Sequence, residues 1–508
     1  MAGLNERVRA IPAECLQAMA RGIEKESLRT DASGHLALTP HPGALGSALT
    51  NPHITTDFSE SQPELVTGVH TSVEGSLAEL TRIHQFVYRH LGDERLWVSS
   101  MPGLLPDEAG IPIGQYGSSN VGRAKTVYRN GLAHRYGKRM QTISGIHYNW
   151  SMPGLSNEQY FALIRNFRRH SFLLLLLFGA SPAVPAAFVA GLTHGLQPLG
   201  EHTLYLPHAT SLRMGRLGYQ SDAQSQLSVS YNGLTGYAAS LQGALTQPYP
   251  PYEAIGIQDE RGQYRQLSTS LLQIENEFYS TIRPKRVIRS GERPLHALRE
   301  RGVEYVEVRC MDLNPFLSIG IDGDTARFID IFLLHCLLSD SPLDSPEEVA
   351  ALARNQQLTA SRGREPGLSL ERGAERVALL DWAAELVAQC EDIAQAVDGA
   401  LGGEGYRQAW ARAQTGVAQP DTLPSARVVT ELQALAARGE GGHVEWARQR
   451  SAQVRDTLLT QPLSDAELQR IERQALESLQ KQALLEATAQ LPFEAFRQEY
   501  VSASHLVV

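Results

Sequence analysis

Cysteine is scarce in this chain: its 508 residues include only Cys15, Cys310, Cys336 and Cys390. Because these residues are far apart and form no CxxC pair, the sequence argues against a thiolate zinc site and a disulfide framework. Reduced thiols are the simpler interpretation. The first residues, "MAGLNERVRAIPAEC", mix charges of both signs and lack the apolar core of a secretory signal. We therefore predict a cytoplasmic protein.

An excess of basic residues is also missing. The chain has 46 Lys and Arg against 55 Asp and Glu, a formal charge of −9. A general nucleic-acid-binding protein would be enriched in basic residues, so nucleic acid is not an expected partner. The hydrophobic fraction of 42% is ordinary for a soluble globular protein.

Long hydrophobic runs are nearly absent. The exception, "SFLLLLLFGASPAVPAAFVAGL" at residues 171–192, has no charged residue. Its strongest part ends at Phe178, and Gly179, Pro182 and Pro185 follow. The preceding "NEQYFALIRNFRRH" has helical periodicity, so the pattern predicts an amphipathic helix that becomes fully buried, and no membrane span.

Several catalytic motifs are lacking. The sequence contains neither the GxxxxGK[ST] P-loop nor GxGxxG, and neither GxSxG nor HExxH. A serine hydrolase or a zinc protease therefore has no support. If the protein uses ATP, its phosphates must be held by metal ions and side chains, because no glycine-rich cradle is present.

The periodicity of the chain indicates an α+β fold with a mainly antiparallel sheet, because short strands and helices do not alternate strictly. From about Ser345 the composition shifts to Ala, Glu, Gln, Leu and Arg with helical periodicity. We predict a catalytic α+β domain at 1–340 and, packed on it, a helical C-terminal subdomain at 341–508. Expected strands are Ala20–Leu28, Gln141–Met152, Gln273–Tyr279 and Val303–Asp312. Expected helices are Ser72–Leu91, Asn157–Phe178, Tyr237–Leu245, Thr325–Leu338, one beginning at "SPEEVAALARNQQ", Ala374–Ala400, Ala426–Ala437 and Asp465–Ala489.

Polar residues recur on one face of each expected strand. Since side chains alternate along a strand, residues two apart point the same way. Taken singly, each strand could simply present a solvated face, whereas several together favour a shared polar funnel. The sets that share a face are Glu24 and Glu26; His147 and Asn149; Gln273, Glu275, Glu277 and Tyr279; and Tyr305, Glu307 and Arg309.

An acidic segment could contribute further oxygen atoms to such a funnel. "TTDFSESQPELVTG" adds Asp57, Glu60 and Glu64, either a solvated acidic loop or part of a cluster of oxygen ligands. Together with the strand carboxylates and His147, such a cluster would form a metal site that favours Mg²⁺ or Mn²⁺ over Zn²⁺.

Several basic residues could bind phosphate groups. "RPKRVIR" contributes Arg283, Lys285, Arg286 and Arg289, and is either a phosphate contact or a solvent-facing loop. Arg309 lies in an apolar strand, where its guanidinium needs a carboxylate or a phosphoryl group as its partner.

Small and polar residues mark two candidate ligand-contacting segments. The first, "YGSSNVGRAKTVYRNGLAHRYG", contains Tyr128 and Arg129, and we assign both to substrate binding. The second, "ATSLRMGRLGYQ", contains Arg213 and Tyr219. From the residues alone, ordinary packing is the better interpretation of Tyr128, Tyr219 and Tyr279.

Together these stretches resemble one family, the proteobacterial type of glutamate–cysteine ligase, also called γ-glutamylcysteine synthetase. The similar stretches follow one another in order from about residue 20 to residue 320, and "GREPGLSL" and "PSARV" near the C-terminus are similar too. The sequence departs from the family pattern at Pro63, where a non-proline residue is expected. The stretches are "GIEKESLRTDASGHLALTPHPGALGSALTNPHITTDFSESQPELVTG", "GDERLWVSSMP", "QYGSSNVGRAKTVYRNGLAHRYG", "MQTISGIHYNWSMP", "LFGASPA", "LPHATSLRMGRLGYQS", "LQIENEFYSTIRPKR" and "GVEYVEVRCMDLNPF".

The resemblance implies a fold related to glutamine synthetase, with an antiparallel sheet curved into a funnel. It also implies that Arg309 faces a transferred phosphoryl group, beside Glu307 as its catalytic partner and with Arg283, Lys285 and Arg286 near the phosphates of ATP. The implied ligands of Mg²⁺ or Mn²⁺ are Glu24, Glu26, Asp57, Glu64, His147 and Glu307. The implied positions around the cysteine substrate are Tyr128, Arg213, Tyr219 and Tyr279.

The activity that the resemblance implies is ATP-dependent joining of the γ-carboxylate of L-glutamate to the amine of L-cysteine through γ-glutamyl phosphate, the first step of glutathione synthesis. Expected partners are these small molecules, with neither nucleic acid nor membrane; a monomer is expected and an oligomer stays open. Two alternatives remain at this point: a γ-glutamyl ligase for another amine on the same scaffold, and a non-catalytic binder of glutamate or nucleotide.

Overall fold

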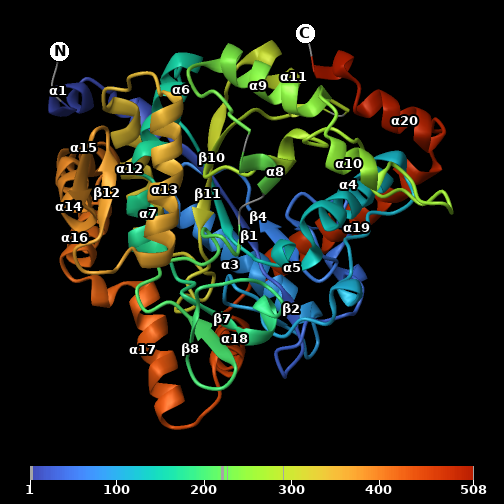
Figure 1. Cartoon of the computed structure of the whole chain (residues 1–508), viewed down its shortest axis with the longest axis horizontal. Helices are drawn as coiled ribbons and strands as arrows, with labels where there is room; N and C mark the ends of the chain where they lie inside the picture. The colour runs from blue at the N-terminus through green and yellow to red at the C-terminus, as the bar shows by residue number, and fades with distance from the viewer. Residues whose placement is uncertain (1–3, 219–221, 226, 290, 507–508) are drawn as a thin grey trace.

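A six-stranded antiparallel sheet runs through the centre of the computed structural model (Figure 1). The α+β class with an antiparallel sheet, predicted from the sequence, is confirmed. The structure describes residues 4–218, 222–225, 227–289 and 291–506. In spatial order the strands are β10 (Ile282–Lys285), β11 (Tyr305–Met311), β6 (Ile146–Ser151), β1 (Ala20–Glu26), β4 (Pro63–Val66) and β3 (Ile54–Thr56).

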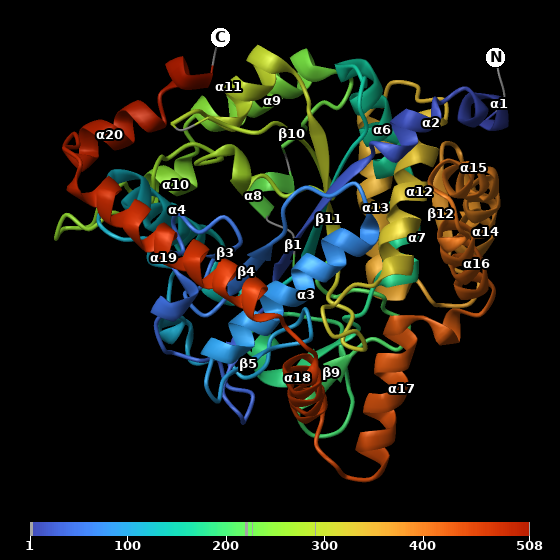
Figure 2. The ribbon, with the colours of Figure 1, turned by 180° about the vertical axis from the view of Figure 1, so that it is seen from behind.

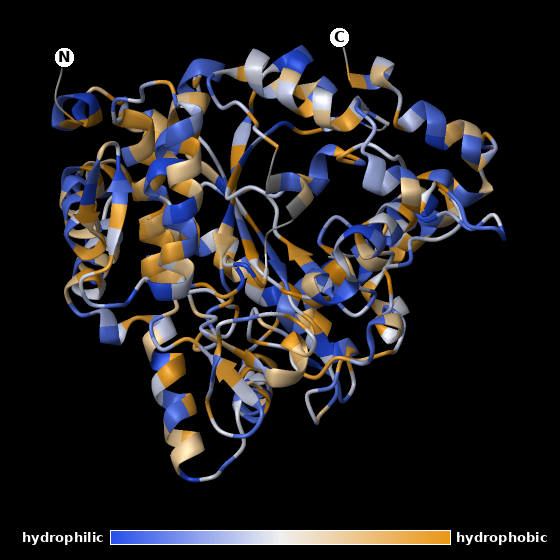
Figure 3. Ribbon diagram, in the orientation of Figure 1, coloured by the Kyte–Doolittle hydropathy of each residue, from blue (hydrophilic) through white to orange (hydrophobic). Residues whose placement is uncertain are grey.

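Side chains alternate between the two faces of the central strands, whose residues are both hydrophobic and hydrophilic in Figure 3. Ile23 of β1, Tyr148 of β6 and Val306 of β11 are each 0% exposed. Tyr148 donates a hydrogen bond to Asp330 at 2.8 Å, so these residues point to the face that helices cover. The opposite face carries polar side chains, and we call it the cavity face. The covering helices are α3 (Val73–His90), α6 (Asn157–His170), α7 (Phe172–Phe178) and α12 (Gly323–Leu338).

One irregularity in the sheet bears on the site. Val308 pairs with Tyr148, but the next pair joins Met311 to Ile146, so β11 contains one residue more than β6 over this interval. This β-bulge falls at Arg309 and Cys310, beside His147 on β6. Bulges bend a strand and re-aim its side chains, and here the bulge sets the direction of Arg309.

The C-terminal third wraps around the sheet and its helices. Figure 2 shows α19 running past α3 towards α20. One hydrophobic cluster includes residues from Val8 to Leu506, so the first and last elements share a core. The elements of this part are α13 (Pro346–Arg362), β12 (Ser369–Arg372), β13 (Glu375–Ala378), α14 (Leu379–Gln389), α15 (Glu391–Leu401), α16 (Gly405–Ala418), α17 (Pro424–Ala437), α18 (His443–Thr460), α19 (Asp465–Ala487) and α20 (Phe493–Tyr500).

Shorter elements connect these parts. The helices are α1 (Leu4–Arg9), α2 (Ala13–Gln17), α4 (Asn120–Tyr136), α5 (Lys138–Gln141), α8 (Asp222–Ser225), α9 (Leu234–Thr246), α10 (Pro250–Ile255) and α11 (Pro294–Arg301). The remaining strands are β2 (Arg29–Thr30), β5 (Arg95–Leu96), β7 (Ala183–Pro185), β8 (Gln197–Pro198) and β9 (Thr203–Tyr205).

Three expected elements need correction. Gln273–Tyr279 is not a strand: residues Glu275–Glu277 form a 3₁₀ turn, in which Glu277 meets Arg135 and Tyr136 at 2.8 and 2.7 Å. The helix expected at Ala374–Ala400 begins instead with strand β13 and is divided at Cys390. The long helix at 157–178 is divided at Ser171 into α6 and α7.

The apolar run is buried, as predicted, because Phe172–Leu177 are at most 3% exposed. Among the described residues, no helix combines the length and the apolar character that a membrane crossing requires.

Candidate active site

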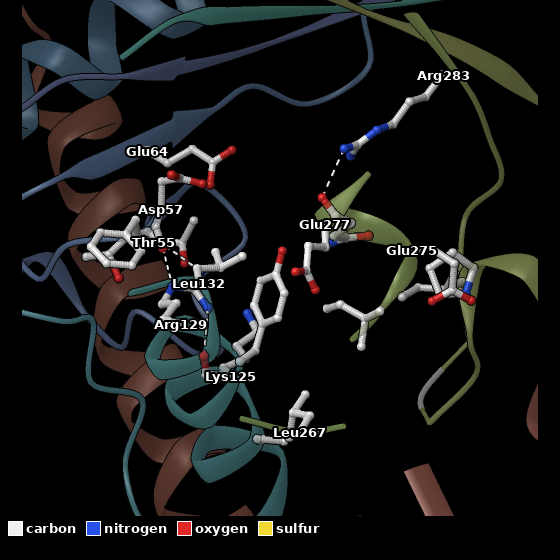
Figure 4. Close-up of a pocket in the computed structure, with 18 of the residues that line it drawn as sticks. Thr55, Asp57, Glu64, Lys125, Arg129, Leu132, Leu267, Glu275, Glu277 and Arg283 are labelled. Atoms are coloured by element: carbon white, nitrogen blue, oxygen red, sulfur yellow. Dashed lines mark hydrogen bonds between the residues drawn. The ribbon is translucent and has the colours of Figure 1, made fainter. Parts of the chain in front are cut away.

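A cavity of about 870 Å³ opens over the cavity face of the sheet. Its volume lies within the range of about 300–1,000 Å³ that is usual for small-molecule sites. Figure 4 shows Asp57 and Glu64 on one side of it, Lys125 and Arg129 on helix α4, and Arg283 and Glu277 on the other side.

The floor of the cavity is formed by β1, β6 and β11, whose register brings the predicted residues together. Glu24 pairs with His147, and His147 Nδ1 lies 3.2 Å from Glu24 Oε2 and 3.9 Å from Glu307 Oε1. His147 Nε2 lies 3.7 Å from Glu26 Oε1. The second oxygen of Glu24 accepts a hydrogen bond from Asn149 Nδ2 at 2.8 Å. One imidazole therefore stands among three carboxylates.

Two further carboxylates come from the β3–β4 hairpin. Asp57 follows the last residue of β3, and Glu64 of β4 pairs with Glu26 of β1. Pro63, the departure from the family pattern, is the first residue of β4, a position where a proline is tolerated. Its carbonyl still accepts a hydrogen bond from Ser27 N at 3.0 Å. We call Glu24, Glu26, Asp57 and Glu64 the carboxylate cluster.

Crowding of like charges raises proton affinity in this cluster. Burial, together with the charge of Asp57, raises the pKa of Glu26 to about 8. Burial and the charges of Glu24, Asp57 and Glu26 raise the pKa of Glu64 well above its ordinary value. Buried carboxylates this close stay ionised only when cations neutralise them.

The residues present fit a hard divalent cation. One ligand atom from each of Glu24, Glu64 and His147 lies within 4.8 Å of the other two. Burial and the nearby Arg309 lower the pKa of His147, which keeps its imidazole in the neutral form that coordinates metals. Carboxylate oxygens are the ligands that Mg²⁺ and Mn²⁺ prefer.

Basic side chains adjoin the carboxylates on the β10–β11 side. Glu307 Oε2 lies 3.1 Å from Arg309 Nη1, and Glu307 Oε1 lies 3.4 Å from Lys285 Nζ. Arg283 Nη1 is 3.9 Å from the same carboxylate. Burial alone would raise the pKa of Glu307, but these cations, with Lys285 first, hold it well below its ordinary value. Glu307 is therefore ionised between the carboxylate cluster and three positive charges.

Helix α4 forms another wall, on which Lys125, Tyr128 and Arg129 share one face. Arg129 donates hydrogen bonds to the carbonyl groups of Asp57 and Thr56, which fixes the hairpin beside it. Burial, with the adjacent charge of Arg129, lowers the pKa of Lys125 to about 8. Across the cavity, Tyr279 OH accepts a hydrogen bond from Gln141 Nε2 at 2.9 Å.

Two of the predicted site residues do not line the main cavity. Arg213 is 0% exposed and does not line the cavity; it donates a hydrogen bond to the carbonyl of Arg309 at 2.9 Å. Arg286 faces a smaller neighbouring cavity of about 310 Å³ and donates to Arg301 O at 2.6 Å. Tyr219 lies outside the described residues. Glu60 does not belong to the site either, because its carboxylate accepts hydrogen bonds from the backbone NH groups of His41 and Gln115.

Sequence reasoning missed several lining residues. Lys125 could have been found, because positions 125, 128 and 129 have the spacing of one helical face. Phe496, Tyr500 and His505 carry no such signal, because they belong to the C-terminal segment that folds back over the cavity. Tyr500 O accepts a hydrogen bond from Arg293 at 2.6 Å, which fixes this segment at the rim.

This chain is similar to known glutamate–cysteine ligases. Residues 7–359 match the family model described as glutamate-cysteine ligase. A glutamate–cysteine ligase of Azotobacter vinelandii is 49% identical over 500 residues, which cover 94% of this chain and 93% of that protein. One from Alcanivorax borkumensis is 45% identical over 526 residues, covering 98% and 99%.

A solved structure agrees with these matches. The crystal structure of a glutamate–cysteine ligase from Francisella tularensis in complex with AMP superimposes with a TM-score of 0.90 at 35% identity, covering 96% of this chain and 98% of that chain.

Proposed function

This chain belongs to the glutamate–cysteine ligase family, and we propose that its cavity joins the γ-carboxylate of L-glutamate to the amine of L-cysteine at the expense of ATP. The observation that carries the proposal is the meeting, on one sheet face, of the carboxylate cluster and His147 with Arg309 and Lys285. Negative ligands on one side and positive groups on the other are what a metal–nucleotide complex requires.

The reaction has two balanced steps. A γ-carboxylate oxygen of glutamate attacks the terminal phosphorus of ATP, the bond to ADP breaks, and γ-glutamyl phosphate forms. The amine of cysteine then attacks the γ-carbonyl carbon, phosphate leaves, and the amine gives up a proton. The products are γ-glutamylcysteine, ADP and phosphate. Of these, γ-glutamylcysteine is the first product on the way to glutathione. No protein nucleophile takes part.

The metal would be held by Glu24, Glu26, Asp57, Glu64, His147 and Glu307. A divalent cation held there would supply charge neutralisation for the phosphates of ATP. The donor set supports this assignment, because the raised pKa values of Glu26 and Glu64 reflect negative charge that a cation would offset. Asn149 orients Glu24 through its hydrogen bond.

Arg309, Lys285 and Arg283 would contact the phosphoryl group during its transfer from ATP to glutamate. Their positive charges converge on Glu307, which holds them in place at 3.1 to 3.9 Å before the substrate arrives. Preorganised cations of this kind stabilise charge that develops in the transition state without reorganisation during the reaction. Arg286 lines the neighbouring cavity, and a contact between Arg286 and the nucleotide would have to be made there.

Tyr128, Arg129 and Tyr279 would contact the amino acids, since all three line the cavity. Arg213 would act indirectly, through its hydrogen bond to the carbonyl of Arg309. Tyr219 keeps its assignment to substrate binding as a proposal from the sequence.

The test is ADP release in the presence of Mg²⁺, ATP and glutamate, with cysteine, 2-aminobutyrate, glycine, ammonia or putrescine as the acceptor. We expect cysteine-dependent turnover and γ-glutamylcysteine identified by its mass. Turnover with another amine alone would change the substrate and retain the scaffold. Metal-dependent ATP binding without turnover for any acceptor would indicate a binding protein.

A further inference from the structure

Three nitrogen and sulfur side chains meet away from the cavity, between α6 and α12. They are His170, the last residue of α6, and His335 and Cys336, near the end of α12. One ligand atom from each lies within 4.8 Å of the other two. None of the three lines the cavity. Sequence reasoning did not reveal this group, because His170 is far along the chain from the other two residues.

Both imidazoles in this group have an unused nitrogen. His335 Nε2 lies 2.8 Å from Gln389 Oε1, and since an amide oxygen only accepts, the Nε2 atom carries the proton and Nδ1 keeps its lone pair. The buried Nδ1 atoms of His335 and His170 have no hydrogen-bond partner among the residues that the structure describes. Buried polar atoms are normally paired, so two in one cluster call for a ligand. A histidine held by an amide on one nitrogen and open on the other is the usual form of a metal ligand.

Burial favours the neutral form of each ligand: it keeps both imidazoles neutral and raises the pKa of the Cys336 thiol well above its ordinary value, so that the thiol gives up its proton only as the ion binds. Burial lowers the pKa of His170 to about 3, helped by His335 and the positive charges of Arg169 and Arg372. Burial also lowers the pKa of His335. Both imidazoles are therefore neutral, and each can offer a lone pair.

Charge and ligand number decide which ion fits. The charged groups that act on His170 are paired, Arg169 with Glu348 and Arg372 with Glu385, at 2.6 Å in both cases, and they supply no surplus negative charge. A monovalent ion bound to one thiolate and two neutral imidazoles leaves the buried site uncharged, whereas a divalent ion leaves a net positive charge there. Thiolate and imidazole ligands favour soft ions, and structural Zn²⁺ almost always takes four ligands.

We propose that His170, His335 and Cys336 form a three-coordinate site for Cu⁺, which they bind in preference to Zn²⁺. Binding exchanges the thiol proton of Cys336 for the ion, and the proton passes to solvent; no electron is transferred. His335 and Cys336 are 1% and 0% exposed, so the ion enters past the half-buried His170. Through Gln389, the site connects α6 and α12 to the end of α14.

The experiment uses the full-length, reduced and metal-stripped protein under anaerobic conditions, with excess Mg²⁺ to occupy the carboxylate cluster. Cu⁺ is supplied from its bicinchoninate complex, and transfer to the protein is followed by loss of the coloured complex. We expect one equivalent to bind, and His170→Gln and Cys336→Ser each to weaken binding by about 100-fold or more. Cys15→Ser, which removes a thiol outside the cluster, should bind like the unmodified protein.

A second measurement is independent of the variants. X-ray absorption of the Cu⁺-loaded protein should show one sulfur and two nitrogen ligands of imidazole type. Sulfur ligands alone, unchanged affinity in His170→Gln, or an equal loss in Cys15→Ser would show adventitious thiol binding and overturn the proposal. So would Zn²⁺ that displaces Cu⁺ at equal free concentration. Neither measurement involves substrate, so the result does not depend on the proposed function.

Discussion

His147 on β6 lies directly opposite Glu24 on β1, and its Nδ1 atom is 3.2 Å from Glu24 Oε2. Because strand side chains alternate, a slip of one residue between these strands would turn one of the two away from the cavity. The register of the sheet therefore fixes the relative position of a carboxylate and an imidazole assigned to the same metal. The same logic extends to Glu26, which pairs with Glu64.

Replacing Glu26 by Gln should lower kcat by about 100-fold or more, because a metal ligand is lost. The fold should survive, since the amide oxygen can still accept the hydrogen bond that Gly145 N now gives to Glu26 at 2.8 Å. Without metal, the variant should melt at about the same temperature as the unmodified protein, because a pKa of about 8 leaves Glu26 largely uncharged at neutral pH. Steady-state kinetics against Mg²⁺ concentration and thermal denaturation check both results. Glu304→Gln, at the exposed residue that precedes β11, is the control, and a fully active Glu26→Gln enzyme would refute the metal role.

Replacing Arg309 by Met should reduce kcat by about 100- to 1,000-fold, the usual cost of losing a preorganised group that stabilises transition-state charge. The KM for cysteine should change little, because the guanidinium is assigned to the phosphoryl group. Initial rates at varied cysteine and ATP separate the two parameters. Arg286→Met removes an arginine outside the main cavity and should leave kcat within a few-fold. An effect on KM for cysteine alone would move Arg309 to the acceptor site.

The part of the site that strands form could be predicted from sequence, because a strand has a fixed period of two. That period placed Glu24, Glu26, His147, Glu307 and Arg309 on common faces, and the structure has them so. The period did not reveal the order of the strands or the bulge at Arg309, which depend on pairing between distant segments.

The same rule misled at Gln273–Tyr279, where alternating polar residues imitate a strand. Glu275 is held by Arg293 at 2.7 Å and Glu277 by Arg135 at 2.8 Å, so tertiary ion pairs decide this local conformation. Arg213 shows another limit of sequence reasoning: the resemblance placed it around the substrate, whereas its complete burial outside the cavity depends on tertiary packing.

Gly145→Ala should damage the site although the residue has no side chain. A Cβ atom at Gly145 would overlap the guanidinium of Arg213, which is 0% exposed and cannot move into solvent. We expect a loss of about 1–3 kcal/mol in the free energy of unfolding, as for an overpacked core, together with lower activity, because Gly145 N also holds Glu26. Denaturant unfolding and ADP release measure the two effects. Gly43→Ala, where a Cβ would meet nothing within 4 Å, is the matched control, and equal stability of the two variants would contradict the prediction.

Acid should destabilise the protein partly through His443, the first residue of α18. Its imidazole is 2% exposed and lies 3.2 Å from Ser99 Oγ, and burial lowers its pKa to about 4. In the unfolded chain the pKa returns to about 6.5, so protonation favours unfolding below that pH. The stabilising contribution is complete above pH 6.5 and is lost as the pH falls towards 4, to a total of about 3 kcal/mol. Comparing the unfolding of the unmodified protein with that of His443→Gln at pH 7.5 and pH 4.5 tests this. The unmodified protein should lose more stability than the variant, whose amide does not titrate. A constant difference between the two would show that the pKa of His443 is the same in the folded and unfolded protein.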